Sequence, residues 1–286
     1  MRAKGNPRRT EHLPGVRRGT AAPDCPVSPS ALAKPVILRP VWIRWFSAIA
    51  AVALLAAGPS HRTDPLTGMV FARIPAGSFQ MGTPPTEPRR EAQEQLHLVT
   101  LSRSFYIGVH EITQAEWTRV MGSNPSNFAH CPRCPVERIT YLDVEAFLQR
   151  LNADSPWSGF RLPTEAEWEY ACRAGGREAY GARGTMTTSR ANYDGEQTKP
   201  VGSYPPNAFG LFDMSGNVWE WTSDDHCPYP AGSVTDPRAQ CGSGLKVIRG
   251  GSWRFGADSA RCGLRYTHRP QDRGYSLGVR LAHDIG

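Results

Sequence analysis

Short apolar segments separated by turn-forming residues predict that the chain begins its folded part with strands. Residues 69–74 and 79–82 flank a turn-forming segment at 75–78, and this spacing is typical of a β-hairpin. After a polar loop, the apolar segments 97–101 and 105–109 predict two further strands. This part of the chain is therefore expected to be rich in β-structure.

Three helices are predicted next, because at each expected start a threonine precedes an acidic residue by three positions, the pattern of a capping box. The pairs are Thr113 with Glu116, Thr140 with Asp143, and Thr164 with Glu167. Helical spacing after the second pair predicts one apolar face, made of Val144, Phe147, Leu148 and Leu151. The same spacing in the third helix places Trp168 and Cys172 toward a core.

Beyond the third helix the chain is rich in loops, with short strands predicted at 246–249 and 277–281. No internal repeat is visible. The order of strands, then helices, then loops predicts an α+β domain with modest regular structure.

The first sixty residues differ from the rest and predict a targeting segment. Residues 1–42 are basic and rich in proline, which predicts a disordered leader. Residues 43–60 resemble a signal peptide, because their apolar run at 46–57 is shorter than the roughly 20 residues of a membrane span. A linker at 61–66 then leads into a folded domain expected over 67–284. These features predict export, with a membrane-anchored protein as the alternative if the leader stays attached.

The positive charge of the chain belongs to this leader. The formal net charge is +7, and residues 1–45 carry nine basic and two acidic residues, so the remaining charges cancel. The folded part therefore has no excess of basic residues for a polyanion. Nucleic acid is not expected as a partner.

Cysteine usage agrees with export. Outside the leader the chain has Cys131, Cys134, Cys172, Cys227, Cys241 and Cys262. An even number in an exported chain predicts up to three disulfides, although spacing alone leaves the pairing open. For Cys131 and Cys134 a loop-closing disulfide is the preferred interpretation, and half a zinc site or a redox dithiol are the alternatives.

The segment 207–224 combines glycines, oxygen-bearing side chains and two tryptophans, a composition typical of an ordered loop that holds a ligand. Asp213, Asn217 and Glu220 offer oxygen ligands to a hard cation such as calcium. Trp219 and Trp221 are two residues apart, so in an extended segment they anchor the same face. The alternative is that the glycines and Asn217 only form turns and that Glu220 is solvated.

Seven motifs in this order resemble the sulfatase-modifying factor family, the family of the formylglycine-generating enzyme. They lie at 79–82 (FQMG), 111–113 (EIT), 135–137 (PVE), 161–170 (RLPTEAEWEY), 210–221 (GLFDMSGNVWEW), 249–253 (RGGSW) and 278–280 (GVR). The resemblance covers nearly all of residues 67–284. It implies a compact, loop-rich variant of the C-type lectin fold.

The resemblance also implies a redox centre, in which the family's enzyme holds copper(I) with two thiolates and oxidises a sulfatase cysteine to formylglycine. The matching positions in this chain are Phe255 and either Ala257 or Ala260. Copper is therefore not expected, and no catalytic residue is assigned. Cys262 is similar instead to a family cysteine whose disulfide partner matches Cys172.

Two calcium sites are implied by the resemblance, and calcium is the expected cofactor. One set consists of Asp213, the carbonyl groups of Gly216 and Val218, and Glu220. The second consists of Asn192 and the carbonyl group of Tyr193, with Asp194 as a further candidate in a shortened loop.

A ligand groove is implied as well. Ser252 and Trp219 match residues that line the family's substrate groove, although Trp219 is equally compatible with core packing. The segment that follows is basic and contains aromatic residues, namely Arg254, Arg261, Arg265, Tyr266, His268, Arg269 and Arg273. From it, Arg254 and Arg265 are the groove candidates for an anionic ligand. The alternative is that these arginines form ion pairs within the fold.

Three functions follow from this combination. The preferred one is an exported, calcium-braced member of the family that binds a protein or a small anionic ligand. The first alternative is a formylglycine-generating oxidase, and the second is a tailoring oxidoreductase of another chemistry.

Overall fold

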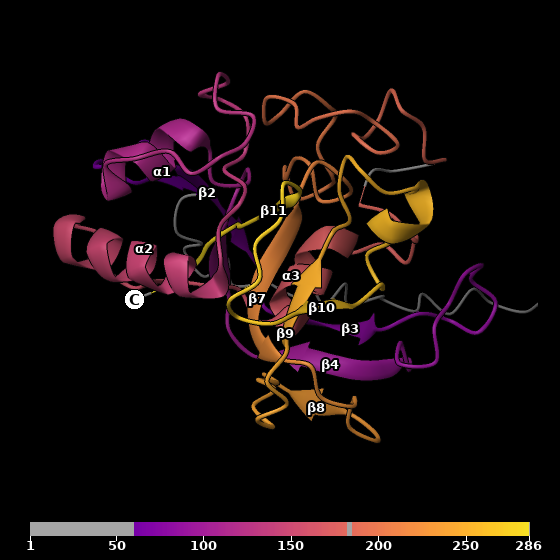
Figure 1. Cartoon of the computed structure of the whole chain (residues 1–286). Helices are drawn as coiled ribbons and strands as arrows, with labels where there is room; N and C mark the ends of the chain where they lie inside the picture. Colours follow the sequence, from indigo (N-terminus) through magenta and orange to yellow (C-terminus); the bar gives the residue numbers. More distant parts are fainter. Residues whose placement is uncertain (1–59, 182–184, 286) are drawn as a thin grey trace, which may run out of the picture. The chain divides into compact units, whose positions relative to one another are not determined.

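The computed structural model describes residues 60–181 and 185–285. The predicted leader and all of the signal-like segment except Ser60 lie outside the described residues. In the described part, the strands form three sheets joined by loops (Figure 1).

The largest sheet has five strands in the order β1-β2-β5-β12-β6, each antiparallel to its neighbours. These are β1 (His61–Thr63), β2 (Val70–Ile74), β5 (Phe105–Gly108), β12 (Ala282–Asp284) and β6 (Phe160–Arg161). Because β1 and β12 both belong to this sheet, the first and last strands of the described part meet in one sheet. Strand β1 occupies part of the range 61–66, so the residues predicted as a linker include an edge strand of this sheet.

Two smaller sheets complete the β-structure. One has the order β10-β9-β7-β11 and the other has the order β3-β4-β8. Their strands are β7 (Trp219–Asp225), β9 (Lys246–Arg249), β10 (Tyr266–His268), β11 (Leu277–Gly278), β3 (Gly77–Met81), β4 (His97–Leu101) and β8 (Val234–Thr235).

The hairpin predicted from residues 69–82 is wrong. Strand β2 pairs with β1 and β5, whereas β3 pairs with β4, so the two predicted partners belong to different sheets. The segment between them contains Pro75, which has no backbone N–H to donate to a ladder. Pairing was decided by residues far along the chain, such as Phe71 opposite Gly108.

The three predicted helices are confirmed. They are α1 (Gln114–Met121), α2 (Tyr141–Asp154) and α3 (Glu165–Arg173), and each begins with the predicted capping box. A short 3-10 helix, η1, spans Ala257–Ala260. Helices α1 and α2 pack against each other, and α3 lies against β7 and β9 (Figure 1).

Two apolar clusters fill the spaces between these elements. In the first, Trp117 of α1 stacks on Phe147 of α2 with ring centroids 4.8 Å apart, and Trp221 of β7 lies in the same cluster. In the second, α3 packs on β2 and β5 through residues that include Trp168 and Cys172. The described part is thus an α+β domain, as predicted.

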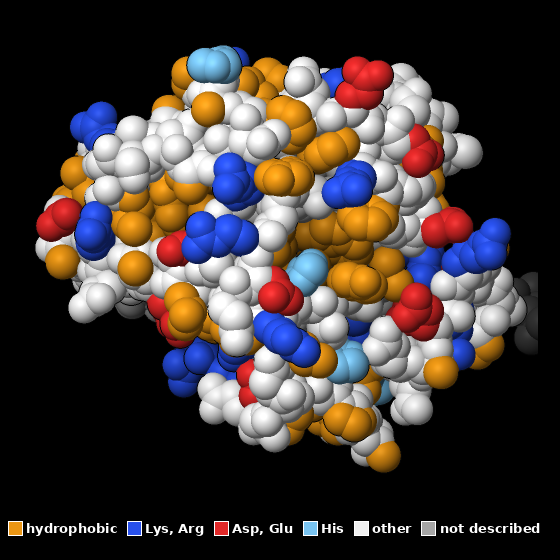
Figure 2. All heavy atoms as spheres, in the orientation of Figure 1, with side chains coloured by type: hydrophobic (Ala, Val, Ile, Leu, Met, Phe, Trp, Pro, Cys, Tyr) orange, Lys and Arg blue, Asp and Glu red, His pale blue; other side chains and the backbone are white. Residues whose placement is uncertain are grey.

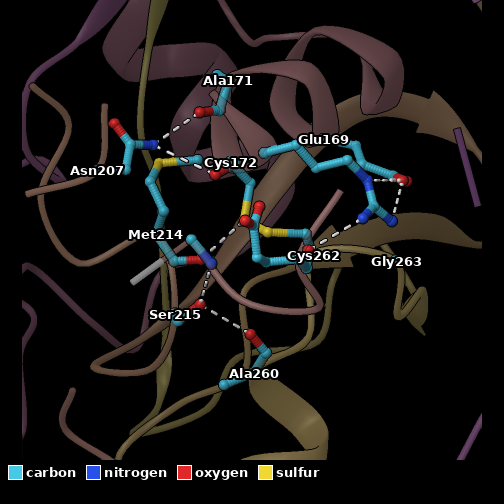
Figure 3. The surroundings of a disulfide bond; sticks show 12 residues. Glu169, Ala171, Cys172, Asn207, Met214, Ser215, Ala260, Cys262 and Gly263 are labelled. Carbon is cyan, nitrogen blue, oxygen red and sulfur yellow. Dashed lines mark hydrogen bonds and ion pairs between the residues drawn. A yellow bond between two sulfur atoms is a disulfide. The ribbon is translucent and has the colours of Figure 1, made fainter. Parts of the chain in front are cut away.

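Three disulfides join the six cysteines of the described part, as Cys131–Cys134, Cys172–Cys262 and Cys227–Cys241. Cys172 and Cys262 are both fully buried. Figure 3 shows their bond beside the loop that contains Asn207 and Met214, and the Asn207 amide donates to the carbonyl of Ala171 over 2.8 Å. This disulfide therefore fixes α3 against two loops at once.

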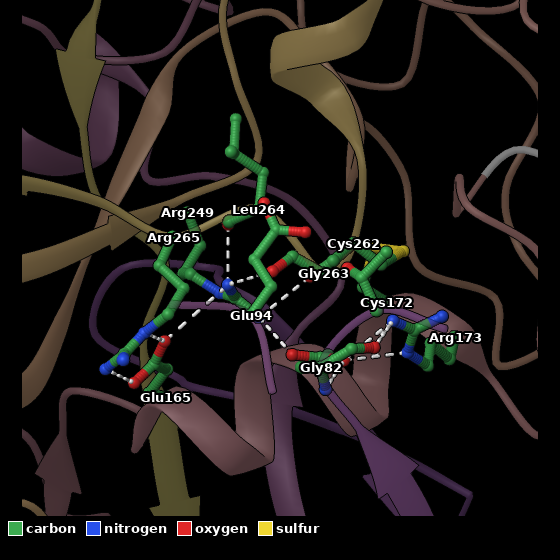
Figure 4. Close-up of polar contacts among 12 residues, drawn as sticks. Gly82, Glu94, Glu165, Cys172, Arg173, Arg249, Cys262, Gly263, Leu264 and Arg265 are labelled. Carbon is green, nitrogen blue, oxygen red and sulfur yellow. Dashed lines mark hydrogen bonds and ion pairs between the residues drawn. A yellow bond between two sulfur atoms is a disulfide. The ribbon is translucent and has the colours of Figure 1, made fainter. Parts of the chain in front are cut away.

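A row of buried ion pairs links α3 to β9 and to the segment after η1 (Figure 4). Glu169 accepts from Arg249, from Arg173 Nε at 2.8 Å and from the backbone N–H of Gly82 at 2.9 Å. One turn away, Glu165 forms two 2.7 Å hydrogen bonds with Arg265. Each guanidinium thus has a carboxylate partner inside the protein.

Replacing Glu169 with Gln should remove the charge that two buried guanidinium groups depend on. Breaking a buried ion pair from one side costs about 3–5 kcal/mol, so the free energy of unfolding of Glu169→Gln should fall by this amount in urea titrations. Glu145→Gln, at an exposed position of α2, is the matched control and should stay within about 0.5 kcal/mol of the parent. Equal unfolding midpoints for the two variants would contradict this role.

Candidate functional site

The predicted ligand loop adopts an irregular backbone that only a few residue types tolerate. Asp213 and Asn217 have positive φ angles of 58° and 60°. Gly216 has a φ of 97°, and a Cβ atom there would lie 2.4 Å from the carbonyl oxygen of Asn192. The loop is therefore pressed against the segment that contains the second predicted calcium set.

Glu220, a predicted calcium ligand on β7, is already paired within the protein. Its carboxylate accepts from Arg280 Nη2 at 2.8 Å and from the indole N–H of Trp168 at 2.6 Å. Arg280 also donates to the carbonyl groups of Gly108, at 2.9 Å, and Phe212, at 2.8 Å. Glu220 is thus a structural anchor as well as a possible oxygen donor.

Two further buried carboxylates interact with Arg280 electrostatically. Asp213 accepts from the backbone N–H of Gly202 at 2.8 Å. Glu111 accepts from the Asn217 amide at 2.9 Å and from the backbone N–H of Val218 at 3.2 Å. Both carboxylates are buried.

Burial is the main cause of the high pKa values of these two groups. It raises the pKa of Asp213 to about 6, with a further contribution from the charge of Glu220. Burial, followed by the charges of Asp213 and Glu220, raises the pKa of Glu111 well above its usual range. Arg280 therefore does not fully offset the cost of ionising these buried carboxyl groups, and a bound cation would stabilise their charged forms.

The second predicted calcium set lies next to the first. The Asn192 amide donates to the side-chain oxygen of Asn217 at 3.1 Å, and the backbone N–H of Asn217 donates to the carbonyl of Asn192 at 2.9 Å. Asn192, Tyr193 and Asp194 line a cavity of about 350 Å³. Asn217, which lies between two residues of the first set in the sequence, is therefore hydrogen-bonded to a residue of the second set.

Within the described residues, no three His, Cys, Asp or Glu side chains lie close enough together to hold one metal ion. A calcium ion at the first set would therefore depend on Asp213 and Glu220 together with the carbonyl groups of Gly216 and Val218. Calcium accepts mixed carboxylate and carbonyl ligands, so these residue types fit it.

The positions expected for copper thiolates do not fit copper. Phe255 is 45% exposed on the surface, and Ala257 and Ala260 belong to η1. Cys262, the nearest cysteine, is bonded to Cys172. Copper(I) is held by soft thiolate or thioether ligands, and this segment offers none.

A groove lies beside this segment, over β10 and β11. It is a cavity of about 410 Å³ whose lining includes Trp219, Phe255, Tyr266 and Tyr275. Trp219 and Tyr266 stack with ring centroids 5.6 Å apart. Figure 2 shows a hollow with hydrophobic side chains in this part of the surface, with basic and a few acidic side chains near it.

Of the four predicted groove residues, the structure places Trp219 and Arg254 in the lining, and Arg138, His268 and Arg273 join them. Ser252 is fully buried, and its hydroxyl has no hydrogen-bond partner among the described residues. Arg265 lies outside the groove, because its guanidinium is buried against Glu165 and lies 4.0 Å from the ring centroid of Tyr229.

The predicted basic segment thus divides into two kinds of arginine. Arg265 and Arg261 are buried, and Arg261 pairs with Glu94 at 2.8 Å and with Glu87 at 3.0 Å. Arg254 and Arg273 are exposed at the groove. The ion-pair interpretation therefore holds for Arg261 and Arg265, whereas Arg254 and Arg273 remain predicted ligand contacts.

Sequence reasoning missed three residues that matter here. Glu111 and Arg280 belong to the quoted motifs EIT and GVR, but the motifs alone did not indicate that the two side chains are buried and interact electrostatically with Asp213. Arg138 reaches the groove from the loop before α2, and its guanidinium lies over the ring of Tyr275. Its place depends on tertiary contacts, because its backbone N–H donates to Gly274.

Comparison with known proteins places these features in context. The model of the sulfatase-modifying factor enzyme 1-like domain matches residues 56–285. The formylglycine-generating enzyme of Mus musculus is 28% identical over 302 residues, which cover 80% of this chain and 78% of that enzyme. The structure of PvdO from Pseudomonas aeruginosa is 31% identical with a TM-score of 0.72, covering 80% of this chain and all of that one. The fold is therefore the compact formylglycine-generating-enzyme variant of the C-type lectin fold.

One relative is much longer. The serine/threonine-protein kinase pkn1 of Chlamydia pneumoniae is 31% identical over 251 residues, which cover 77% of this chain but only 38% of the kinase. The chain therefore spans little more than a third of that relative. In the described ranges, no helix is long and apolar enough to cross a membrane.

Calcium should remove a pH-dependent loss of folding stability that Asp213 causes. The folded pKa of about 6 exceeds the ordinary value of 3.8, so without calcium this group should cost stability as the pH rises from about 4 through about 6, by about 3 kcal/mol at most. Melting temperatures recorded over this pH range, with chelator and with excess calcium, should diverge as the pH rises.

The control for this experiment is Asp213→Asn, which removes the titrating group. In this variant the melting temperatures with chelator and with calcium should differ much less as the pH rises. Asp224, whose pKa burial also raises to about 6, should contribute a similar decline that calcium does not change. Identical melting curves with chelator and with calcium at about neutral pH would contradict the calcium site, because occupancy at about 100 times the dissociation constant should add about 2.7 kcal/mol.

Proposed function

The chain belongs to the sulfatase-modifying factor family, and on that basis we propose that it is an exported binding protein. In this proposal its groove holds a protein segment or a small anionic ligand, and calcium braces the loop beneath the groove. The observation that carries the proposal is the groove itself, which has exposed aromatic rings and arginines where the family's oxidase would need two thiolates.

The exposed rings support a binding role. Phe255, Tyr266 and Tyr275 are 45%, 53% and 49% exposed, and all three line the same cavity. Large apolar side chains gathered on a surface are typical of interaction sites. Tyrosine, tryptophan and arginine are also the residues that contribute most to binding energy in protein interfaces.

The charge of the groove supports an anionic ligand. Arg138, Arg254, His268 and Arg273 line the cavity, and no Asp or Glu is among its lining residues. Arg273 forms one ion pair, with Asp143 at 3.5 Å, and both side chains of this pair are exposed. Guanidinium groups bind carboxylates and sulfates through paired N–H donors, so they suit acidic side chains or a small organic anion.

Calcium has a structural role in this proposal. Asp213 belongs to the loop that leads into β7, Glu220 belongs to β7 itself, and the indole of Trp219 on β7 forms part of the groove wall. A cation that offsets the buried carboxylate charge would hold this wall in place. It would not contact the ligand.

Oxidation of a sulfatase cysteine to formylglycine is the alternative, since one relative carries the name of that enzyme. It would require a copper site other than the segment 252–262. A tailoring oxidoreductase of another chemistry is the second alternative, but no specific observation in the groove favours it.

Export is supported by the three disulfides, because such bonds persist in oxidising compartments outside the cytosol. Cleavage of the leader would release the domain, and an uncleaved leader would keep it at a membrane. The signal-like segment 43–60 is the reason for proposing a secretory route.

Charge reversal at the groove should weaken binding of an acidic probe. A peptide of tyrosine and glutamate should bind the protein in isothermal titration calorimetry, and binding should weaken as salt is added. Arg254→Glu should raise the dissociation constant about tenfold or more, because a hydrogen bond to a charged group contributes about 1.5–3 kcal/mol.

Arg103→Glu provides the matched control, since Arg103 is an exposed arginine that lines a different cavity. This variant should bind the peptide like the parent. If both variants bind equally well, or if a lysine peptide binds more tightly than the glutamate peptide, the groove does not select anions.

A further inference from the structure

We propose that the Cys131–Cys134 disulfide is an exchange site that oxidises a dithiol in a partner protein. This activity is separate from ligand binding in the groove. It rests on three features of the segment 131–134: the accessibility of its two sulfur atoms, the support of its backbone, and the cavity beside it.

The two cysteines differ in accessibility. Cys131 is half-buried, whereas Cys134 is 3% exposed. An incoming thiolate can therefore reach the sulfur of Cys131 more easily than that of Cys134. The Cys134 sulfur lies 3.9 Å from the carbonyl oxygen of Thr198, so an acceptor for the thiol proton is already in place when the pair is reduced.

The backbone of this segment is held without the disulfide. Cys134 N–H donates to the carbonyl of Cys131 at 2.9 Å, and the first residues of α1, Gln114 and Ala115, donate to the carbonyls of Cys134 and Pro132 at 3.0 Å each. Val201 N–H donates to the carbonyl of Arg133 at 2.9 Å. Four backbone hydrogen bonds therefore hold this segment independently of the S–S bond.

The disulfide also adds the least to stability through chain entropy. Its cysteines are 3 residues apart, compared with 14 for Cys227–Cys241 and 90 for Cys172–Cys262. In the chain-entropy account, the stabilisation from a disulfide grows with the length of the loop that it closes. Cys131–Cys134 is the pair that the fold can most easily open and close.

The residues around the Cys131–Cys134 disulfide suit the docking of a partner protein and the formation of a thiolate. Pro132 lines a cavity of about 480 Å³ together with residues of α1, including Gln114 and Ala115. Arg133, between the two cysteines, is exposed, and a neighbouring cation stabilises a thiolate. The cavity gives a partner chain a surface to dock on beside Cys131.

The exchange balances without any metal or other cofactor. A thiolate of the partner attacks Cys131 Sγ, forms a new S–S bond and displaces the Cys134 thiolate, which takes up a proton. The second partner thiol then attacks the partner sulfur of this mixed disulfide and displaces Cys131. The partner loses two electrons and two protons and becomes a disulfide, and the cysteine pair becomes two thiols. A small-molecule disulfide would reoxidise the pair.

Trapping with single-cysteine variants tests the proposal. The full chain, with Cys25→Ser in every variant, is incubated with a thiol peptide activated as a mixed disulfide. Cys134→Ser leaves Cys131 free and should form the protein–peptide disulfide at least about tenfold faster than Cys131→Ser, whose remaining thiol is buried. Equal rates for the two variants would contradict the assigned roles.

Selective reduction tests the same claim on the intact protein. A reduced peptide with two cysteines should be oxidised by the protein, with disulfide mapping by mass spectrometry showing that only Cys131 and Cys134 become thiols. The melting temperature should then fall by no more than about 7 °C, because the loop that this bond closes is short, whereas the Cys172→Ser/Cys262→Ser variant opens a far longer loop and should lose about 9 °C or more. The proposal is contradicted if the pair reacts only after unfolding in urea, or if its reduction lowers the melting temperature as much as loss of Cys172–Cys262. The bond would then have only a structural role.

Discussion

The buried ion pair between Glu220 and Arg280 is the contact on which the rest of the domain depends. Through it β7 meets the indole of Trp168 on α3, the carbonyl of Gly108 on β5 and the carbonyl of Phe212 in the ligand loop. The guanidinium of Arg280 thus binds three separate parts of the chain, and α3 joins them through the hydrogen bond from Trp168 to Glu220. Such a pair is costly to bury and costly to break from one side, so it fixes which loop conformations are compatible with the fold.

The segment that follows β9 contains arginines of two kinds, one that stabilises the fold and one that is available for a ligand. Arginines of the segment that follows β9 either face inward to carboxylates, as Arg261 and Arg265 do, or face the groove, as Arg254 does. The inward ones stabilise the fold. The groove-facing arginines and the nearby aromatic rings take no part in these buried ion pairs. Ligand preference can therefore change at these positions while the fold is kept.

Local sequence signals predicted the parts of the fold that local interactions decide. Each capping box gave the start of a helix, because Thr140 and Asp143 satisfy each other's backbone within one turn. Strand pairing was harder to predict from local sequence, because β2 and β3 are neighbours in the sequence but belong to different sheets. The site was predictable only through family motifs, and Arg265 shows their limit, because sequence alone does not tell an arginine paired with Glu165 from one that faces a ligand.

The central claim is that this domain binds its ligand and does not oxidise it. The most direct measurement is mass analysis of a Cys-x-Pro-x-Arg peptide after incubation with the protein, copper and oxygen. The account predicts that the cysteine has its original mass once all disulfides have been reduced, because Phe255, Ala257 and Ala260 supply no thiolate to hold copper(I). Formation of formylglycine over repeated turnovers would contradict it.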